Sequence, residues 1–239
     1  MRVLAVDTST ATGSVALVDD AQIVAEVQLE SRSRHAENLL PVIRTTLGWA
    51  DASPESLALL AVGIGPGSFT GLRTSLATVK GLAFALDRPV VGVPSIEVLA
   101  FGMARPPAVA IPVIDAHKNE VFAAAYRVLD DEVEELVSPR HGAPGTLLED
   151  VVKALGESDP HHVWLAGNGL RRHPVPSGLA AARVCPPRDD VPRAALLAEL
   201  ARRRFDRDGP SDLVALEPLY LRASDAKLPK EPLSIDHVD

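Results

Sequence analysis

The sequence has one cysteine, no long hydrophobic run and fewer basic than acidic residues. A single cysteine, Cys185, excludes an internal disulfide. The first apolar run, Val3 to Val6, ends at Asp7, which is too early for a signal peptide or a membrane span. These absences predict a cytoplasmic protein that makes no membrane contact.

The excess of acidic over basic residues also limits which partners the chain is expected to bind. The 24 lysines and arginines are outnumbered by 32 aspartates and glutamates, for a net charge of -8. About -3 of this charge falls on residues 1–102 and about -5 on the remainder. Nucleic-acid clamps concentrate lysine and arginine on one face, and neither half does so. Any nucleic-acid substrate is therefore expected to be held by another protein.

The chain is long and apolar enough to form a substantial core, with 239 residues of which 46% are hydrophobic. Alternating and helical patterns of apolar residues predict the order of elements in the first half. Ser33 and Gly48 are expected to cap and stop the first helix, and Pro41 to bend it. The predicted strands are residues 2–6, 14–18, 23–29, 57–64 and 89–93, and the predicted helices are residues 36–47, 72–86 and 95–103.

The second half repeats this order more loosely. Asp7 and Asp115 each end the first strand of their half, and a polar turn follows each of them. Residues 173–192 are rich in proline and are predicted to be the least regular region. The predicted strands are residues 108–114, 121–129, 132–137 and 163–166, and the predicted helices are residues 146–155 and 193–205.

Two β-β-β-α-β-α units in one chain predict an α/β protein of the actin-like, Hsp70-like and sugar-kinase (ASKHA) class, with mixed sheets and flanking helices. The expected domains are an N-terminal one over residues 1–102 and a smaller C-terminal one over residues 103–217. Residues 218–239 are expected to form a tail.

Four segments resemble one known family. They are LAVDTST (residues 4–10), GIGPGSFTGLR (63–73), IDA (114–116) followed by EV (120–121), and PLYLR (218–222). In this order and spacing they are similar to the TsaB (YeaZ) family, nearly from end to end of the chain. The resemblance implies an actin-like fold and a role in forming threonylcarbamoyladenosine next to the anticodon of tRNAs that read codons beginning with A.

The resemblance also implies partners. Members of the family form a heterodimer with a catalytic paralogue, TsaD, and act with the ATPase TsaE and with TsaC, which makes threonylcarbamoyl-adenylate. The chain is thus expected to be a non-catalytic scaffold that meets tRNA only through the complex. Whether the isolated chain forms a homodimer is left open by the sequence. The alternatives are an autonomous ATPase or sugar kinase of this fold, and a glycoprotease-type peptidase.

Two positions test the alternative of a metal enzyme. Proteins similar to TsaD place two metal-binding histidines, spaced H-x-x-x-H, just after the strand that corresponds to residues 89–93. Ser95 and Leu99 occupy the matching positions here. Leucine offers no lone pair and a neutral hydroxyl is a poor ligand, so no metal and no catalytic residue are expected.

The case for a nucleotide is less clear. In the superfamily, two hairpins after strand-ending aspartates hold phosphates through backbone N–H groups. The first hairpin keeps Asp7, Thr8 and Ser9, whereas the second, from Asp115, has no glycine. An adenine-binding loop survives only as Gly167 to Gly169. We therefore expect a vestigial site and no cofactor. Weak ATP or ADP binding stays open, and the alternative is that both aspartates cap their hairpins.

The glycine-rich turn between the strand at 57–64 and the next helix is expected to be structural. It lacks the lysine of a phosphate-binding loop. Glycines permit a sharp turn, and either Ser68 or Thr70 can cap the helix. The residues of this predicted structural turn are Gly65, Gly67, Ser68, Thr70 and Gly71.

The helix predicted over residues 72–86 has two stripes. Leu72, Leu76, Val79, Ala83 and Leu86 form an apolar stripe suited to packing on a sheet. A second stripe holds only small residues, where a solvent-facing stripe would favour lysine, glutamate and glutamine. We predict that this stripe binds a partner helix, and the alternative is an intramolecular neighbour. The predicted partner-binding residues are Thr74, Thr78, Gly81 and Ala85, with His35 and Leu39 from the preceding helix.

Overall fold

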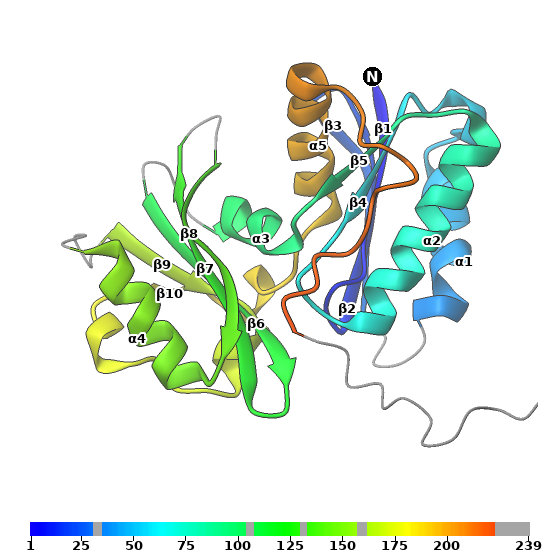
Figure 1. The fold of residues 1–239 in the computed structure, drawn as a ribbon. Helices are drawn as coiled ribbons and strands as arrows, with labels where there is room; N and C mark the ends of the chain where they lie inside the picture. The colour runs from blue at the N-terminus through cyan, green and yellow to red at the C-terminus, as the bar shows by residue number, and fades with distance from the viewer. Residues whose placement is uncertain (31–34, 104–107, 130–132, 157–161, 223–239) are drawn as a thin grey trace, which may run out of the picture.

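Two five-stranded mixed sheets lie side by side in the computed structural model (Figure 1). The structure describes residues 1–30, 35–103, 108–129, 133–156 and 162–222, without the side chains of residues 35 and 36. The predicted cap Ser33 and residues 223–239 of the predicted tail (218–239) therefore lie outside the described residues, whereas residues 218–222 are described and pack on the molecule.

The first sheet has the order β3-β2-β1-β4-β5. β1 to β3 pair antiparallel, and β4 and β5 continue the sheet in parallel. Its strands are β1 (Arg2–Asp7), β2 (Thr12–Asp19), β3 (Gln22–Glu30), β4 (Leu59–Gly63) and β5 (Val90–Val93).

The second sheet repeats the first strand for strand, in the order β10-β9-β6-β7-β8. β6 to β8 pair antiparallel, and β9 and β10 continue in parallel. Its strands are β6 (Ala108–His117), β7 (Glu120–Val128), β8 (Val133–Gly142), β9 (Val163–Ala166) and β10 (Arg183–Val184). The predicted duplicated topology and the actin-like fold class are thereby confirmed.

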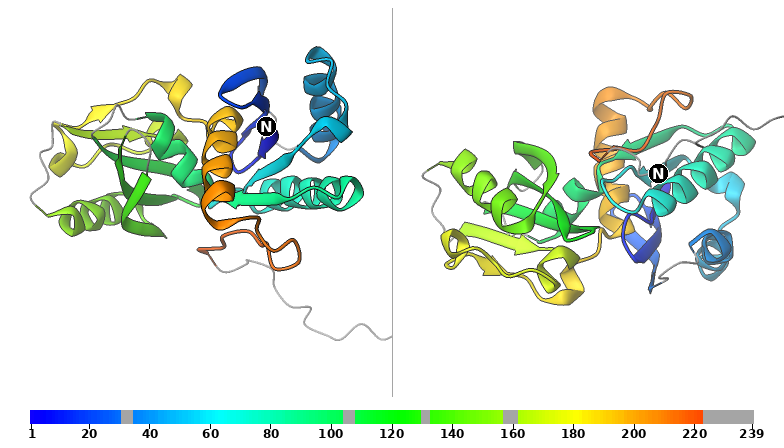
Figure 2. Two further views of the ribbon diagram at one scale, coloured as in Figure 1. Left: turned by 90° about the horizontal axis from the view of Figure 1, so that it is seen from above. Right: turned by 60° about the horizontal axis from the view of Figure 1, so that its bottom comes forward.

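Helices cover both faces of each sheet (Figures 1 and 2). Side chains of β1 alternate between two cores, because successive residues of a strand point to opposite faces. Leu4 and Val6 pack under α1 (His35–Trp49) and α2 (Phe69–Leu86), whereas Val3 and Ala5 pack under α5 (Ala194–Asp208). On the second sheet, α4 (Pro144–Leu155) covers one face and α3 (Ser95–Met103) the other.

The two halves exchange helices. α3 follows β5 but packs on β6, β7 and β9, while α5 follows the second sheet but packs on β1, β2, β4 and β5. The start of α5 is tied to the first sheet, since Ala194 N donates to Ser14 Oγ at 2.9 Å. A partly buried ion pair between Glu97 and Arg204 joins α3 to α5. Figure 2 shows α5 standing between the two halves. The range 103–217, expected as one domain, thus contains a helix that packs with the first sheet.

The proline-rich region holds more structure than the sequence predicted. It contains β10, which completes the second sheet, and short 3-10 helices at Ser177–Leu179 and Pro187–Asp189. In the described residues between β9 and β10, short 3-10 turns stand where the first half has the long helix α2. Only the first half therefore presents a long helix at this point of the topology.

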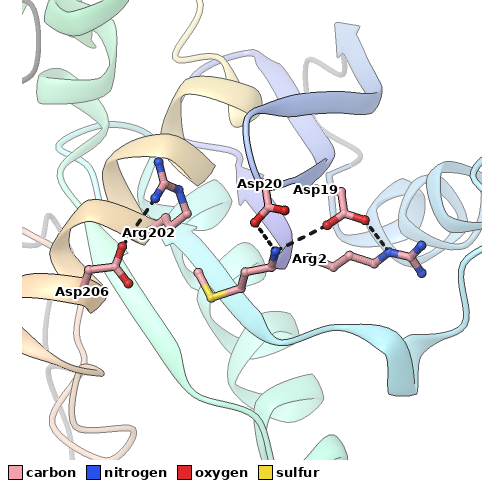
Figure 3. Close-up of polar contacts among 6 residues, drawn as sticks. Arg2, Asp19, Asp20, Arg202 and Asp206 are labelled. Atoms are coloured by element: carbon pink, nitrogen blue, oxygen red, sulfur yellow. Dashed lines mark hydrogen bonds and ion pairs between the residues drawn. The ribbon is translucent and has the colours of Figure 1, made fainter.

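Exposed ion pairs gather at the end of β1 away from Asp7 (Figure 3). The N-terminal ammonium pairs with Asp19 and Asp20, and Arg2 Nε lies 2.9 Å from Asp19 Oδ2. Pairs of this kind contribute about 0–1 kcal/mol each. The buried clusters on the four sheet faces, and not these pairs, hold the fold together.

Candidate functional site

The glycine-rich turn packs directly on the hairpin after β1. Ser68 N donates to Ser9 O at 2.7 Å, and Thr8 Oγ1 donates to Gly71 O at 2.7 Å. A Cβ atom on Gly67 would lie 2.2 Å from Ser9 O, and one on Gly71 would lie 2.0 Å from Thr8 O. Only glycine permits this approach. Ser68 Oγ accepts from Gly71 N at 3.3 Å as the N-cap, so α2 begins at Phe69, three residues earlier than predicted.

The chain after α5 runs back along the first half as a strap, residues 209–222, drawn in orange in Figure 1. Lys80 Nζ donates to two strap carbonyls, and Leu219 N donates to Ile64 O at 2.7 Å. At its end, Arg222 Nη1 donates to Ala116 O at 2.7 Å, near the end of β6. The strap therefore links α2 and the glycine-rich turn to the second half, and all four family-like segments meet in one region.

A cleft of about 700 Å³ opens in this region between the two halves. Hydroxyl side chains of Ser9, Thr10, Thr12, Ser68 and Thr70 line one wall. The opposite wall includes Asp115, His117, Asn168, Arg171 and Arg172. Parts of both predicted phosphate hairpins and of the Gly167–Gly169 loop thus face one cavity.

Both hairpin aspartates are occupied by their own turns. Asp7 Oδ1 accepts from Ser9 N at 2.8 Å and from Ser9 Oγ at 2.6 Å. Asp115 Oδ1 accepts from His117 N at 3.0 Å. The capping role that the sequence offered as an alternative is confirmed at both positions. The backbone N–H groups of Ser9 and His117 therefore donate to carboxylates within the chain.

The two cleft arginines are also paired internally. Arg172 Nη1 lies 2.7 Å from Asp115 Oδ2, and Arg171 Nε lies 2.6 Å from Asp190 Oδ2. The Arg171 guanidinium donates hydrogen bonds to the Asp190 carboxylate, and these raise the pKa of Arg171. These pairs neutralise the basic side chains that a phosphate would need. Binding of ATP or ADP in the cleft stays a prediction.

The Gly167–Gly169 loop packs against β6. Gly167 has φ +124°, and a Cβ atom there would lie 2.0 Å from Val113 O. A Cβ atom on Gly169 would lie 2.9 Å from Val113 Cγ1. Gly167 N donates to Asp190 Oδ1 at 2.9 Å. Both glycines serve close packing of the loop on the strand.

The positions that match the histidines of TsaD-like proteins lie in the interior. Ser95 is fully buried, and its Oγ accepts from Gly65 N at 3.0 Å. Leu99 is 2% exposed and packs in the core of the second sheet. Within the described ranges, no group of three or more histidine, cysteine, aspartate or glutamate side chains is arranged to hold a metal ion. Ser95 instead fastens the glycine-rich turn to α3.

The two predicted faces of α2 are distinct in the structure. Leu76, Val79 and Ala83 are buried against the first sheet, Leu86 is partly buried there, and Leu72 is buried beside Gly65, as expected of the apolar stripe. On the other side, Ala85 is exposed and a Cβ atom built on Gly81 meets nothing within 4 Å. Thr74 and Thr78 are half-buried. Phe84, which the sequence did not single out, is 83% exposed on the same helix.

The residues predicted on the preceding helix need a correction. Leu39 is 4% exposed and belongs to the core under α1, so its choice as a partner contact was wrong. Its neighbour Leu40 is 51% exposed. The register of α1 turns Leu39 inward, together with Ile43 and Leu47. The side chain of His35 lies outside the described residues.

A stacked cluster at the start of α2 was also missed. The Arg73 guanidinium carbon lies 3.8 Å from the centre of the Phe69 ring, and Arg73 Nε donates to Tyr220 OH at 3.0 Å. The rings of Phe69 and Tyr220 are 5.4 Å apart. The only signal in the sequence was that these residues belong to two of the family-like segments.

Known proteins match this chain over most of its length. A family profile described as "TsaD: tRNA N6-adenosine threonylcarbamoyltransferase" matches residues 22–184. The tRNA threonylcarbamoyladenosine biosynthesis protein TsaB of Bacillus subtilis is 28% identical over 95% of this chain and 96% of its own. TsaB of Escherichia coli is 36% identical over 53% of this chain and 55% of its own. The chain belongs to the TsaB (YeaZ) family.

Solved structures agree with membership of the TsaB family. YeaZ from Pseudomonas aeruginosa has a TM-score of 0.76 at 28% identity and covers 92% of this chain and 99% of its own. A dehydratase activator from Clostridium difficile, at 12% identity and a TM-score of 0.52, shares the fold alone. No helix in the described part of this TsaB-family chain is both long and apolar enough to cross a membrane.

Proposed function

We propose that this protein is a non-catalytic subunit that binds a TsaD-like catalytic paralogue as a heterodimer and enables it to transfer threonylcarbamoyl to adenosine in tRNA. In this role it works in the cytoplasm, meets TsaE through the complex and reaches tRNA only within it. It needs no cofactor of its own. Self-association through the same face is the alternative state of the isolated chain.

One observation supports this role above the others, namely the outward face of α2. Gly81 and Ala85 leave the helix backbone open, and helices approach most closely, at about 8 Å, where side chains are small. Phe84 is 83% exposed on the same helix, a large apolar side chain that gains about 1.5–3 kcal/mol when a partner buries it fully. Such a face suits a helix of another subunit.

The pairing of the cleft residues and the burial of Ser95 count against independent catalysis. An autonomous ATPase needs donors free to hold phosphates, yet Arg171 and Arg172 are paired with carboxylates and both hairpins are capped by Asp7 and Asp115. A metal-dependent peptidase needs ligands, and the matching position Ser95 is fully buried. These features support a scaffold over either alternative.

The test uses bulky substitutions on the open face. Gly81→Leu and Thr78→Trp should abolish heterodimer formation with a TsaD homologue, because either side chain holds the partner helix away. Gly81→Ala is the matched control, since it changes the same residue but adds one methyl group in open space. Assembly is measured by size-exclusion chromatography with light scattering, and folding by circular dichroism.

Two results would contradict the proposal. Normal assembly of Gly81→Leu and Thr78→Trp would show that this face of α2 binds no partner. Loss of folding in both variants would show that the stripe is internal packing.

A further inference from the structure

Arg73 is held in one position on the surface of the isolated chain. Its guanidinium stacks on the Phe69 ring at 3.8 Å, and its Nε donates to Tyr220 OH at 3.0 Å. Phe69 and Tyr220 are 42% and 45% exposed, so the cluster faces solvent. An arginine normally loses much rotamer freedom when it binds, and stacking in the free protein reduces that loss.

The charge of Arg73 is not neutralised by a carboxylate within the described chain. Among the described residues, no carboxylate forms an ion pair with Arg73, and its only hydrogen bond there is made by Nε. Several other arginines differ, since Arg2, Arg127, Arg171, Arg172, Arg193 and Arg204 are each paired with an aspartate or glutamate. The two Nη groups of Arg73 together can hold both oxygens of one carboxylate, end-on.

The charge of α2 is opposite to that of the whole chain. α2 has no aspartate or glutamate, and its charged residues are Arg73 and Lys80. The chain as a whole has a net charge of -8. Lys80 is bonded to strap carbonyls, which leaves Arg73 as the cation fixed at the edge of the open face. An acidic group on a partner is the complement of this edge.

We propose that Phe69, Arg73 and Tyr220 form a docking platform for a carboxylate of the partner protein, which Arg73 holds through its Nη groups. This inference rests on the proposed function, because it places the platform beside the face of α2 that receives the paralogue. The platform also favours a different protein over a second copy. A symmetric dimer would place α2 against α2, and this helix has no carboxylate to offer Arg73.

The experiment measures the affinity of the full chain for a TsaD homologue by titration calorimetry, at low and at high NaCl. Arg73→Gln should weaken binding about tenfold or more, since a hydrogen bond to a charged group is lost. Arg73→Lys should restore part of the affinity, and Tyr220→Phe should weaken binding less than Arg73→Gln. Wild-type affinity should fall with salt more steeply than that of Arg73→Gln. Arg127→Gln, an equal change of charge on β7, should bind as wild type does.

Several outcomes would overturn the proposal. One is wild-type affinity and salt dependence in Arg73→Gln while Gly81→Leu still abolishes assembly, which would leave the proposed function intact. Another is unchanged protein affinity but weaker tRNA binding by the assembled pair, which would assign the platform to phosphate. A third is equal weakening of self-association and heterodimer formation by Arg73→Gln. A melting temperature equal to that of the wild type confirms that each variant is folded.

Discussion

Truncation of Leu76 to alanine distinguishes the buried face of α2 from its open face in one measurement. Leu76 is 7% exposed and lies on the buried face of α2. It packs there in one core with Val79 of the same helix and with Leu4 and Val62 of the first sheet. Leu76→Ala removes three carbon groups from this core, at about 0.8 kcal/mol each. A residual cavity of about 50 Å³ adds about 1.2 kcal/mol at roughly 24 cal/mol per Å³. The expected loss of unfolding free energy is therefore about 3–4 kcal/mol.

Urea unfolding followed by circular dichroism checks this value, and the melting temperature should fall by roughly 6–16 °C. Gly81→Ala on the same helix is the control, and it should raise stability by about 0.5–1 kcal/mol because glycine is a poor helix former. At a temperature where Leu76→Ala is still folded, its affinity for the paralogue should match that of the wild type. A loss below about 1 kcal/mol would refute the assignment of Leu76 to the core.

Two further predictions concern buried titratable groups. Burial raises the pKa of Glu97 despite its pair with Arg204, so the contribution of Glu97 to wild-type stability falls as pH rises above the ordinary value of 4.5. Glu97→Gln lacks this fall. The difference in unfolding free energy, Glu97→Gln minus wild type, should therefore be larger at neutral than at acid pH. An equal difference at both pH values would contradict this prediction. Burial raises the pKa of Cys185 to about 11, so its thiol should react with Ellman's reagent only after unfolding. Rapid reaction of the folded protein would show that the thiol is accessible.

The order of elements was predictable because it depends on local patterns. The alternation of apolar residues in β3 and the apolar stripe of α2 each identified an element within a few residues. Errors at boundaries arose from capping, as at Ser68, whose side chain accepts the Gly71 N–H and starts α2 early. β10 was missed because two residues in a proline-rich stretch show no period, and pairing with β9 alone defines that strand.

The site was less predictable, because it depends on contacts between distant residues. The stacking of Arg73 on Phe69 lies within one helix turn, but the bond from Arg73 to Tyr220 joins residues that are 147 positions apart. Leu39 was placed wrongly because successive residues of a helix lie only about 100° apart, and only the packing of α1 on the sheet shows that Leu39 is buried and Leu40 exposed. The capping of Asp7 and Asp115 was foreseen, since an aspartate before a tight turn bonds to the backbone two residues on.

The central claim is that the chain enables a catalytic paralogue and does not catalyse by itself. The direct measurement is formation of threonylcarbamoyladenosine in unmodified tRNA, by a purified TsaD homologue with TsaC and TsaE, with and without this chain. The account predicts product only when both the chain and the TsaD homologue are present, and none with Gly81→Leu. Equal product without the chain, or product from the chain without the TsaD homologue, would contradict it.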